Sequence, residues 1–294
     1  MWKPRCWLVL GAFLWSGAAW AGGLRVIYPA YESASDARFT DLIELLQTAL
    51  DKTVADFGPY ELRPSTLKMN EGRYLYALKE GQEINIGWSS TSIEKERELL
   101  PLRIPLRKGI LGYRIALIAR DNQAKIDQVR TLADLRQLSV GQGLGWGDIA
   151  LYESNGIKVF QARYDNLFKM VSLGRFDLFP RGIGEIYTEY AHFAPADPKL
   201  AIEKGLLIYY PWPYYFFFNK KDEALRKRVE TGIRRMMKDG SFDANFKKYN
   251  GKAIEAANLK GRRVIRIAND LLPKETPLND PALWFDPARD LPPN

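Results

Sequence analysis

Short apolar runs and amphipathic helical patterns alternate along the first ninety or so residues of the chain. Leu24–Tyr28 is rich in strand-forming residues and ends at Pro29, and between Phe39 and Leu50 the apolar residues recur at helical spacing. The next predicted elements are a strand at Tyr60–Pro64, a helix at Asn70–Lys79 with Asn70 as its N-cap, and a strand at Ile84–Trp88. Strands that alternate with helices of this length predict α/β units with parallel strands.

A second α/β set follows the strong strand predicted at Tyr113–Ala119. After a polar linker, Thr131-Leu-Ala-Asp134 has the capping-box pattern of a helix start, a threonine with an acidic residue three positions later. The set begins at Leu138 and contains helices at Asp148–Ser154, Tyr164–Leu173 and Gly184–Tyr190 and strands at Ile157–Phe160 and Phe176–Phe179.

A proline-rich break, Pro211-Trp212-Pro213, is where the chain would turn back toward its first half. Strands are predicted on either side of the break, at Leu206–Tyr210 and Tyr214–Asn219, and helices at Asp222–Lys238 and Phe242–Tyr249. After Gly251 the chain is rich in Pro, Asp and Asn, with a last strand at Val264–Ile267 and a loose tail at Pro287–Asn294.

These patterns predict an α/β fold of two lobes with a hinge and a central cleft. We expect lobe 1 to comprise residues 22–119 and 213–250 and lobe 2 residues 120–212, with a C-terminal extension, 251–294, packing on lobe 1. Two crossings of the chain between the lobes would make the hinge. The cleft between such lobes is a usual place for a small ligand.

The first 21 residues read as a cleavable secretory signal peptide. Lys3 and Arg5 precede an uncharged, mostly apolar run, Trp7–Leu14, and Ala19-Trp20-Ala21 supplies small residues at the two positions that a signal peptidase reads. The run is too short for a membrane anchor, which needs about 20 apolar residues. Cys6 is poorly placed for lipid attachment. We therefore expect cleavage after Ala21 and an extracytoplasmic protein.

Composition excludes several kinds of chemistry. The chain has one cysteine, Cys6, within the signal peptide, and one histidine, His192, so disulfides, zinc sites and serine–histidine catalysis are disfavoured, and no metal or cofactor is expected. Loss of Lys3 and Arg5 with the signal lowers the net charge from +8 to +6. Because the basic residues are scattered, this charge favours acidic ligands weakly and nucleic acid not at all.

Three segments resemble a known family. They are Ile84–Gly109, which begins Ile-Asn-Ile-Gly-Trp-Ser-Ser-Thr, the stretch from Thr131-Leu-Ala-Asp to the glycines after Val140, and Leu173-Gly-Arg-Phe-Asp-Leu-Phe-Pro-Arg181. In order and spacing they resemble the type 2 periplasmic solute-binding proteins, in particular the polar amino-acid receptors of ABC transporters. The resemblance covers most of residues 24–250.

This resemblance implies the two-lobe fold of periplasmic binding proteins of type 2. It also implies a monomer that captures a small polar or anionic solute by closure of the lobes, without chemistry on it, and presents the closed form to a membrane permease. Two alternatives stay open. One is a sensor that reports to a membrane signalling protein, and the other is an enzyme on the same fold, of the cyclohexadienyl dehydratase type.

The glycine-rich stretch Gly141–Asp148 is the first candidate for a ligand contact. A strand ends there and a helix begins near Asp148, so exposed N–H groups could receive a carboxylate or a phosphate, with Gln142, Gly145 and Trp146 beside it. A plain glycine-rich turn capped by Asp148 is the alternative. The stretch matches neither nucleotide-binding glycine pattern.

Arg181 is the main departure from the family pattern. The resemblance implies an acidic residue near this position for the ammonium group of an amino acid, whereas a guanidinium would pair with an anion. The alternative is an arginine neutralised by the nearby Glu185. If Arg181 contacts the ligand, an ordinary α-amino acid is disfavoured.

Further candidates follow two strands of lobe 1. Hydroxyls and an aromatic plane suited to a polar molecule end the strand at 84–88, and the first loop after Tyr28 is another cleft-lining place. These candidates are Trp88, Ser89, Ser90, Thr91, Tyr31 and Glu32, with Arg97 and Arg114 as additional anion contacts. A capped turn or a solvent-facing strand position would explain several of them equally well. The aromatic run Trp212–Phe218 is better explained by a buried returning strand than by a membrane or sugar contact.

Overall fold

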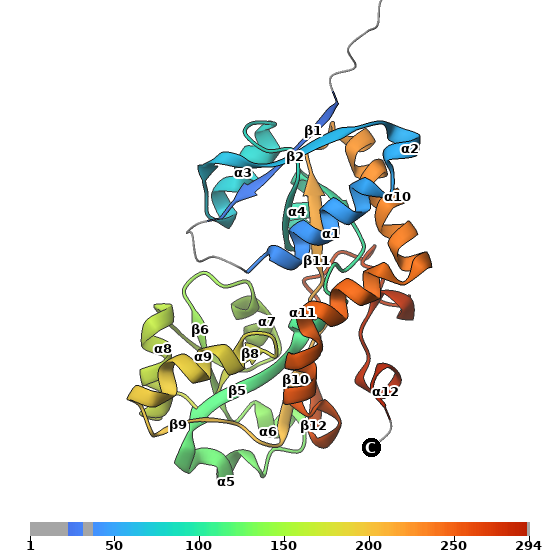
Figure 1. Cartoon of the computed structure of the whole chain (residues 1–294). Helices are drawn as coiled ribbons and strands as arrows, with labels where there is room; N and C mark the ends of the chain where they lie inside the picture. Colours follow the sequence, from blue (N-terminus) through green and yellow to red (C-terminus); the bar gives the residue numbers. More distant parts are fainter. Residues whose placement is uncertain (1–22, 32–37, 293–294) are drawn as a thin grey trace, which may run out of the picture.

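The computed structural model describes residues 23–31 and 38–292 of the chain. The predicted signal peptide and Glu32 lie outside these residues. Two α/β lobes stand one above the other in Figure 1, with the first strands in the upper lobe and the green and yellow segments in the lower one. The predicted two-lobe α/β fold is therefore confirmed.

Lobe 1 is built on two small sheets. The strands β1 (Leu24–Ala30) and β2 (Tyr60–Lys68) pair in parallel, whereas β11 (Tyr214–Phe218) lies antiparallel between β3 (Gly87–Ser90) and β4 (Leu100–Leu102). The helices of this lobe are α1 (Thr40–Asp51), α2 (Val54–Phe57), α3 (Glu71–Glu80), α4 (Ile93–Glu98) and α10 (Glu223–Asp239). Helices α1 and α10 pack against each other over the core, where a Cβ at Gly232 would lie 2.1 Å from the Ala49 carbonyl oxygen. That packing requires a glycine at position 232.

Lobe 2 is organised around β5 (Tyr113–Ala119). All seven of its residues are buried, and it pairs antiparallel with β8 (Phe179–Gly182), β9 (Leu200–Ile202) and β10 (Leu206–Tyr209). The strands β6 (Ser139–Gly143) and β7 (Lys158–Ala162) form a parallel pair beside them. The helices are α5 (Gln123–Ile126), α6 (Leu132–Leu135), α7 (Asp148–Ser154), α8 (Tyr164–Ser172) and α9 (Ile186–Phe193). The capping box predicted at Thr131 and Asp134 is present.

Two of the predicted lobe assignments require correction. The strand Tyr113–Ala119 was expected in lobe 1 but is the centre of the lobe 2 sheet. The extension after residue 250 was expected on lobe 1. Its Leu283 and Trp284 do pack there, but β12 (Arg263–Arg266) adds to the lobe 2 sheet in parallel with β10. The sequence does not predict either placement, because an apolar strand pattern does not indicate which sheet the strand joins. The end of the tail also forms a short helix, α12 (Pro287–Asp290), instead of a loose segment.

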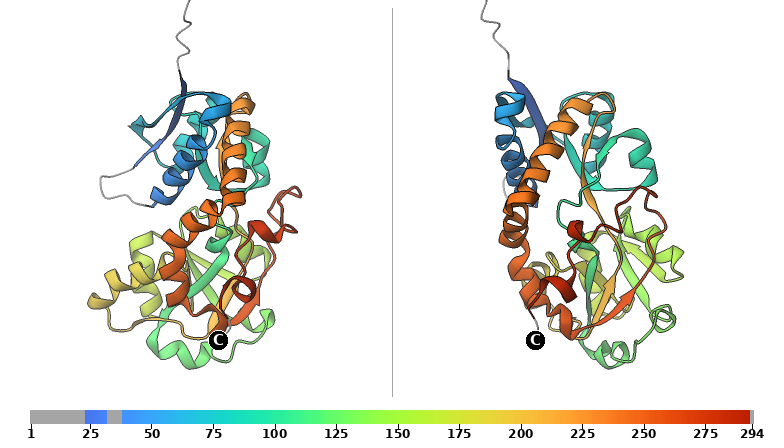
Figure 2. Two further views of the ribbon diagram at one scale, coloured as in Figure 1. Left: turned by 45° about the vertical axis from the view of Figure 1, so that its right-hand side comes forward. Right: turned by 90° about the vertical axis from the view of Figure 1, so that its right-hand side faces the viewer.

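The lobes are connected at more places than the two predicted crossings. Besides the segments around Leu111 and Trp212, α11 (Ser241–Ala257) runs from one lobe to the other, as Figures 1 and 2 show. Its Phe242 belongs to the core of lobe 1 and its Phe246 to that of lobe 2. The C-terminal segment repeats this arrangement, because Trp284 packs in lobe 1 and the next residue, Phe285, in lobe 2.

Candidate functional site

Two buried arginines lie side by side on adjacent strands of lobe 2. The register of β5 and β8 pairs Arg114 with Gly182 and Ile115 with Arg181. Arg114 forms an ion pair of 2.8 Å with Asp148, the first residue of α7, and Arg181 donates two hydrogen bonds of 2.7 Å to Glu189 of α9. Burial opposes both charges, but the nearby carboxylates outweigh it and the pKa of each arginine is raised. Both side chains are therefore permanently charged and held in place.

Glu185 is shared between these two arginines. One of its carboxylate oxygens lies 3.2 Å from Arg181 and 3.7 Å from Arg114, and it accepts a hydrogen bond from the Gly182 backbone N–H at 3.0 Å. Burial would raise the pKa of Glu185, but Arg181 and Arg114 outweigh burial and lower it. The predicted alternative for Arg181, neutralisation by Glu185, is thus present, together with a stronger contact to Glu189 that the sequence analysis did not name.

Asp148 is enclosed by tyrosines as well as by Arg114. Tyr210 donates a hydrogen bond to its carboxylate, and Tyr152 lies against Tyr210 with the rings edge to face. Burial, together with the negative charge of Asp148, raises the pKa of Tyr210 well above its ordinary value. Because Tyr210 immediately precedes the crossing at 211–213, this contact ties the start of α7 to the hinge.

The glycine-rich stretch is accounted for by the packing of Trp146. The Trp146 ring stacks on Phe179. The Arg181 guanidinium lies against the same ring, with its Cζ 4.7 Å from the ring centroid. A Cβ at Gly143 would lie 2.2 Å from the indole, and Gly145 adopts a φ of +76° at an exposed turn. Helix α7, at seven residues, is too short to offer a strong N-terminal dipole, and Asp148 already occupies its start. Gln142 is buried at the end of β6.

In lobe 1, the end of β3 is held by a lysine that the sequence analysis did not name. Lys95 donates hydrogen bonds to the Ser89 hydroxyl at 2.6 Å and to the Ser90 carbonyl at 2.9 Å, and Glu71 accepts one from Ser89 at 2.6 Å. The Thr91 hydroxyl donates a hydrogen bond to the Glu96 carboxylate on the other side of the turn. Arg97 is exposed on α4 and makes no hydrogen bond or ion pair within the described residues. The structure thus does not bring Arg97 to this corner.

Arg107 of lobe 1 lies close enough to lobe 2 for its charge to act on Glu185. It forms a two-pronged ion pair with Asp41 of α1, at 2.6 and 2.7 Å, and lies over the rings of Phe39 and Tyr214. Its charge also contributes to the lowered pKa of Glu185 across the cleft. Asp41 and Arg107 are 66 positions apart, so no local sequence pattern predicts that they form an ion pair.

Trp88 and Tyr31 meet at a small pocket of lobe 1. Pro29, Ala30, Phe39, Met69 and Tyr74 complete its lining. Trp88 is buried, with the ring of Phe39 at 5.3 Å. The structure therefore brings these two predicted residues together, while Gln142 and Arg97 contact neither of the charge clusters described above.

Three of the predicted residues carry a buried donor without a hydrogen-bond partner. They are the Nε1 of Trp88, the Nε of Arg114 and the Nε2 of Gln142, three of the six unpartnered side-chain atoms buried in the described part of the chain. All three atoms are N–H donors. Such groups are rare in folded proteins, and each lowers stability by about 1–3 kcal/mol. Their occurrence in three residues predicted to contact a ligand supports that prediction.

Neither a metal site nor a membrane span is found among residues 23–31 and 38–292. No group of three or more His, Cys, Asp and Glu side chains in these ranges could hold a metal ion. No helix in them is long and apolar enough to cross a membrane.

Comparison with solved structures supports the fold. The chain is similar to an ancestral arginine-binding protein bound to arginine, at 19% identity and a TM-score of 0.51 over 78% of this chain and 98% of that one. The Bacillus subtilis protein YckB matches at 17% identity and a TM-score of 0.54, over 85% and 97% of the two chains. A protein from a study of glutathione import in Streptococcus mutans matches at 14% and 0.53, over 78% and 95%.

These matches show that the chain has the two-lobe fold found in solute-binding proteins, as the sequence resemblance implied. At such identities they say nothing about the ligand. No family model matches the sequence, and no curated protein is detectably similar to it.

Proposed function

We propose that this protein is an extracytoplasmic receptor that captures a small polar solute with acidic groups between its two lobes. The observation that carries the proposal is the set of unpartnered donors on Trp88, Arg114 and Gln142. An acceptor oxygen of a solute would satisfy each of these donors that it reaches, whereas an ammonium group would satisfy none.

The charges of the cleft favour the same class of solute. Arg114 and Arg181 of lobe 2 contact Glu185, and their charges together with that of Arg107 in lobe 1 lower its pKa despite burial. The electrostatic potential at that carboxylate is therefore positive. A carboxylate of a solute that took the place of Glu185 would be stabilised by the same arginines.

We propose that the protein releases the solute to the membrane permease of an ABC-type transporter. The predicted signal peptide supports export across the inner membrane, with the protein working in the periplasm. Closure of the lobes around the solute would give the permease a surface to recognise. The proposal involves no reaction on the solute.

A thermal-shift screen tests the proposal with Gln142→Leu and Thr276→Val as matched variants. Dicarboxylates, monocarboxylates, amino acids and sugars are titrated, since a binder raises the unfolding midpoint with its concentration. Gln142→Leu removes one of the three unpartnered donors, and Thr276→Val removes an unpartnered buried hydroxyl elsewhere. We expect acids to stabilise the wild type and Thr276→Val alike, and Gln142→Leu to need about tenfold more acid.

An equal response of the two variants would show that Gln142 is not a contact. Stabilisation by sugars or cationic amino acids, with no effect of acids, would refute the acidic solute while leaving the receptor fold intact.

A further inference from the structure

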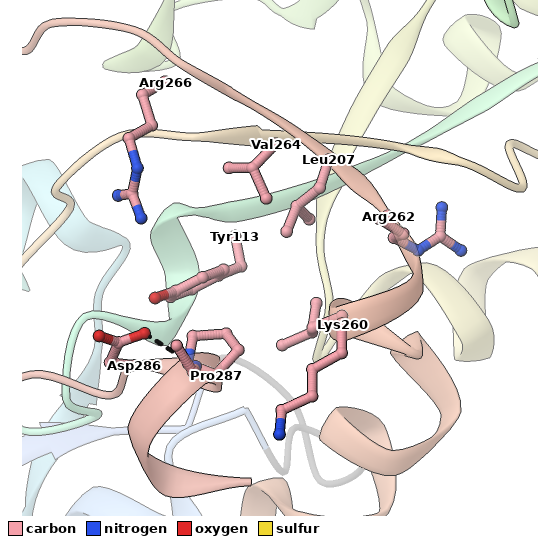
Figure 3. A pocket seen from close by; sticks show the side chains of 10 residues that line it. Tyr113, Leu207, Lys260, Arg262, Val264, Arg266, Asp286 and Pro287 are labelled. Atoms are coloured by element: carbon pink, nitrogen blue, oxygen red, sulfur yellow. Dashed lines mark hydrogen bonds between the residues drawn. The ribbon is translucent and has the colours of Figure 1, made fainter. Parts of the chain in front are cut away.

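A second pocket, outside the cleft, lies where the C-terminal segment covers the edge of the lobe 2 sheet. It encloses about 530 Å³, within the usual range of small-molecule sites. Tyr113 of β5, Leu207 of β10 and Val264 of β12 come from three neighbouring strands, and Pro287 of α12 forms the opposite wall, as Figure 3 shows. None of the candidate residues of the cleft lines it.

One part of this pocket is apolar. Leu207 and Val264 are opposite each other in the β10–β12 register, and Leu259 lines the pocket near them. Val264 is 43% exposed, on the edge strand of the sheet. An apolar group placed there would remove this surface from water.

The other end carries one positive and one negative side chain that are not paired with each other. The Arg266 guanidinium lies over the ring of Tyr209, 4.7 Å from the ring centroid, and makes no side-chain hydrogen bond or ion pair within residues 23–31 and 38–292. Asp286 uses one carboxylate oxygen to cap α12 at the Ala288 N–H and, within the same residues, has no ion pair. Figure 3 shows the two groups on either side of the Tyr113 hydroxyl, with Leu207 and Val264 farther along the pocket.

The remaining cations of the pocket are already engaged in structure. Arg262 donates to the Glu203 carboxylate at 3.1 Å and to backbone carbonyls, and Lys260 donates to the carbonyls of Leu291 and Pro292. The Tyr113 hydroxyl donates to the Phe285 carbonyl at 2.8 Å. These bonds fix the wall of the pocket and leave Arg266 and Asp286 as the groups available to a ligand.

We propose that this pocket binds a small zwitterion with an apolar body, such as a free α-amino acid with an aromatic or aliphatic side chain. The carboxylate of the ligand pairs with Arg266, its ammonium pairs with Asp286, and its side chain lies between Val264 and Pro287. The site is separate from the solute cleft and does not depend on the function proposed there.

Three probes that share a phenylethyl body and differ in which charged groups they carry test the site by isothermal titration calorimetry. Phenylalanine carries both charges, 3-phenylpropanoate only the negative one and phenethylamine only the positive one. We expect phenylalanine to bind about tenfold more tightly than either analogue, since each charged pair contributes to affinity. Arg266→Gln should abolish the advantage of phenylalanine over phenethylamine, and Asp286→Asn its advantage over 3-phenylpropanoate.

The variants are chosen to keep the fold. Arg266 is exposed, and asparagine caps a helix as well as aspartate does. Arg97→Gln, a change at another exposed arginine without an ion pair among the described residues, is the control and should leave all three affinities unchanged. Loss of phenylalanine binding in Gln142→Leu but not in Arg266→Gln would assign the binding to the cleft and overturn the proposal. Absence of phenylalanine binding to the wild type would do the same.

Discussion

The carboxylate of Glu185 lies 3.2 Å from the guanidinium of Arg181, although Arg181 already donates two hydrogen bonds to Glu189. Arg114, 3.7 Å from Glu185, likewise has its own partner in Asp148. Glu185 is therefore a carboxylate in excess of what the two arginines need. It occupies the place where the proposed function would put an acidic group of the solute.

Replacement of Glu185 by glutamine should strengthen the binding of an acidic solute. The amide oxygen can still accept the Gly182 N–H, while the competing negative charge is gone. We expect acids that stabilise the wild type to bind about tenfold more tightly to Glu185→Gln in calorimetric titrations, because an interaction with a charged group is worth roughly 1.5 kcal/mol. Glu153→Gln, at an exposed position of α7, is the control. Weaker binding of acids to Glu185→Gln would mean that Glu185 holds a positive group of the solute.

Arg181 and Glu189 should show strong energetic coupling. Their side chains are 8% and 12% exposed, so Arg181→Gln leaves a buried carboxylate without its main partner and should lower the free energy of unfolding by about 3 kcal/mol. Arg181→Gln/Glu189→Gln should recover most of this loss in urea denaturation. Lys248→Gln, which breaks the exposed pair with Glu44, should cost less than about 1 kcal/mol. Additive effects of the two substitutions at 181 and 189 would rule out the coupling.

Local signals in the sequence predicted most of the individual helices and strands. The strand Tyr113–Ala119, the helix Asp148–Ser154 and the N-cap at Asn70 all occur as predicted, because alternation, helical spacing and capping act within a few residues. The placement of β5 in lobe 2 and of β12 beside β10 depends on contacts across the chain, and periodicity contains no information about them.

The candidate site divides in the same way. Arg114, Asp148, Arg181 and Glu185 come together, since strand ends and helix starts of one lobe meet at one edge. Lys95 and Arg107 escaped prediction because their roles depend on partners in other elements. The role of Tyr210 is evident only from its hydrogen bond to Asp148, and the two residues are 62 positions apart in the sequence.

Gly109 should be essential for the contact between the C-terminal segment and lobe 1. Its φ is +68°, and a Cβ there would lie 2.4 Å from the Trp284 ring. Gly109→Ala combines backbone strain with a clash and should lower the free energy of unfolding by about 2–3 kcal/mol in urea denaturation. Trp284→Ala removes the clash, so the alanine at 109 should cost markedly less in that background. An equal cost of Gly109→Ala in both backgrounds would show that strain alone is responsible.

Asp177 should make the stability of lobe 2 depend on acid pH. Its carboxylate accepts hydrogen bonds from Lys125 at 2.5 Å and from the backbone N–H and hydroxyl of Ser139, each at 2.9 Å. Burial would raise the pKa of Asp177, but these partners outweigh burial and lower it below its ordinary value of 3.8. The charged form therefore stabilises the fold above about pH 4, and this contribution is lost as the pH falls through the lowered pKa.

Asp177→Asn should lower the free energy of unfolding at pH 7 and should flatten its decline between about pH 4 and pH 2, because the variant has no carboxylate to protonate there. The measurement is urea denaturation at a series of pH values. Asp121→Asn, at an exposed carboxylate without a side-chain partner among the described residues, should follow the wild-type curve. If Asp177→Asn and the wild type declined in parallel, the acid sensitivity would have to come from other carboxylates, and the contacts of Asp177 would be worth no more in the charged than in the protonated form.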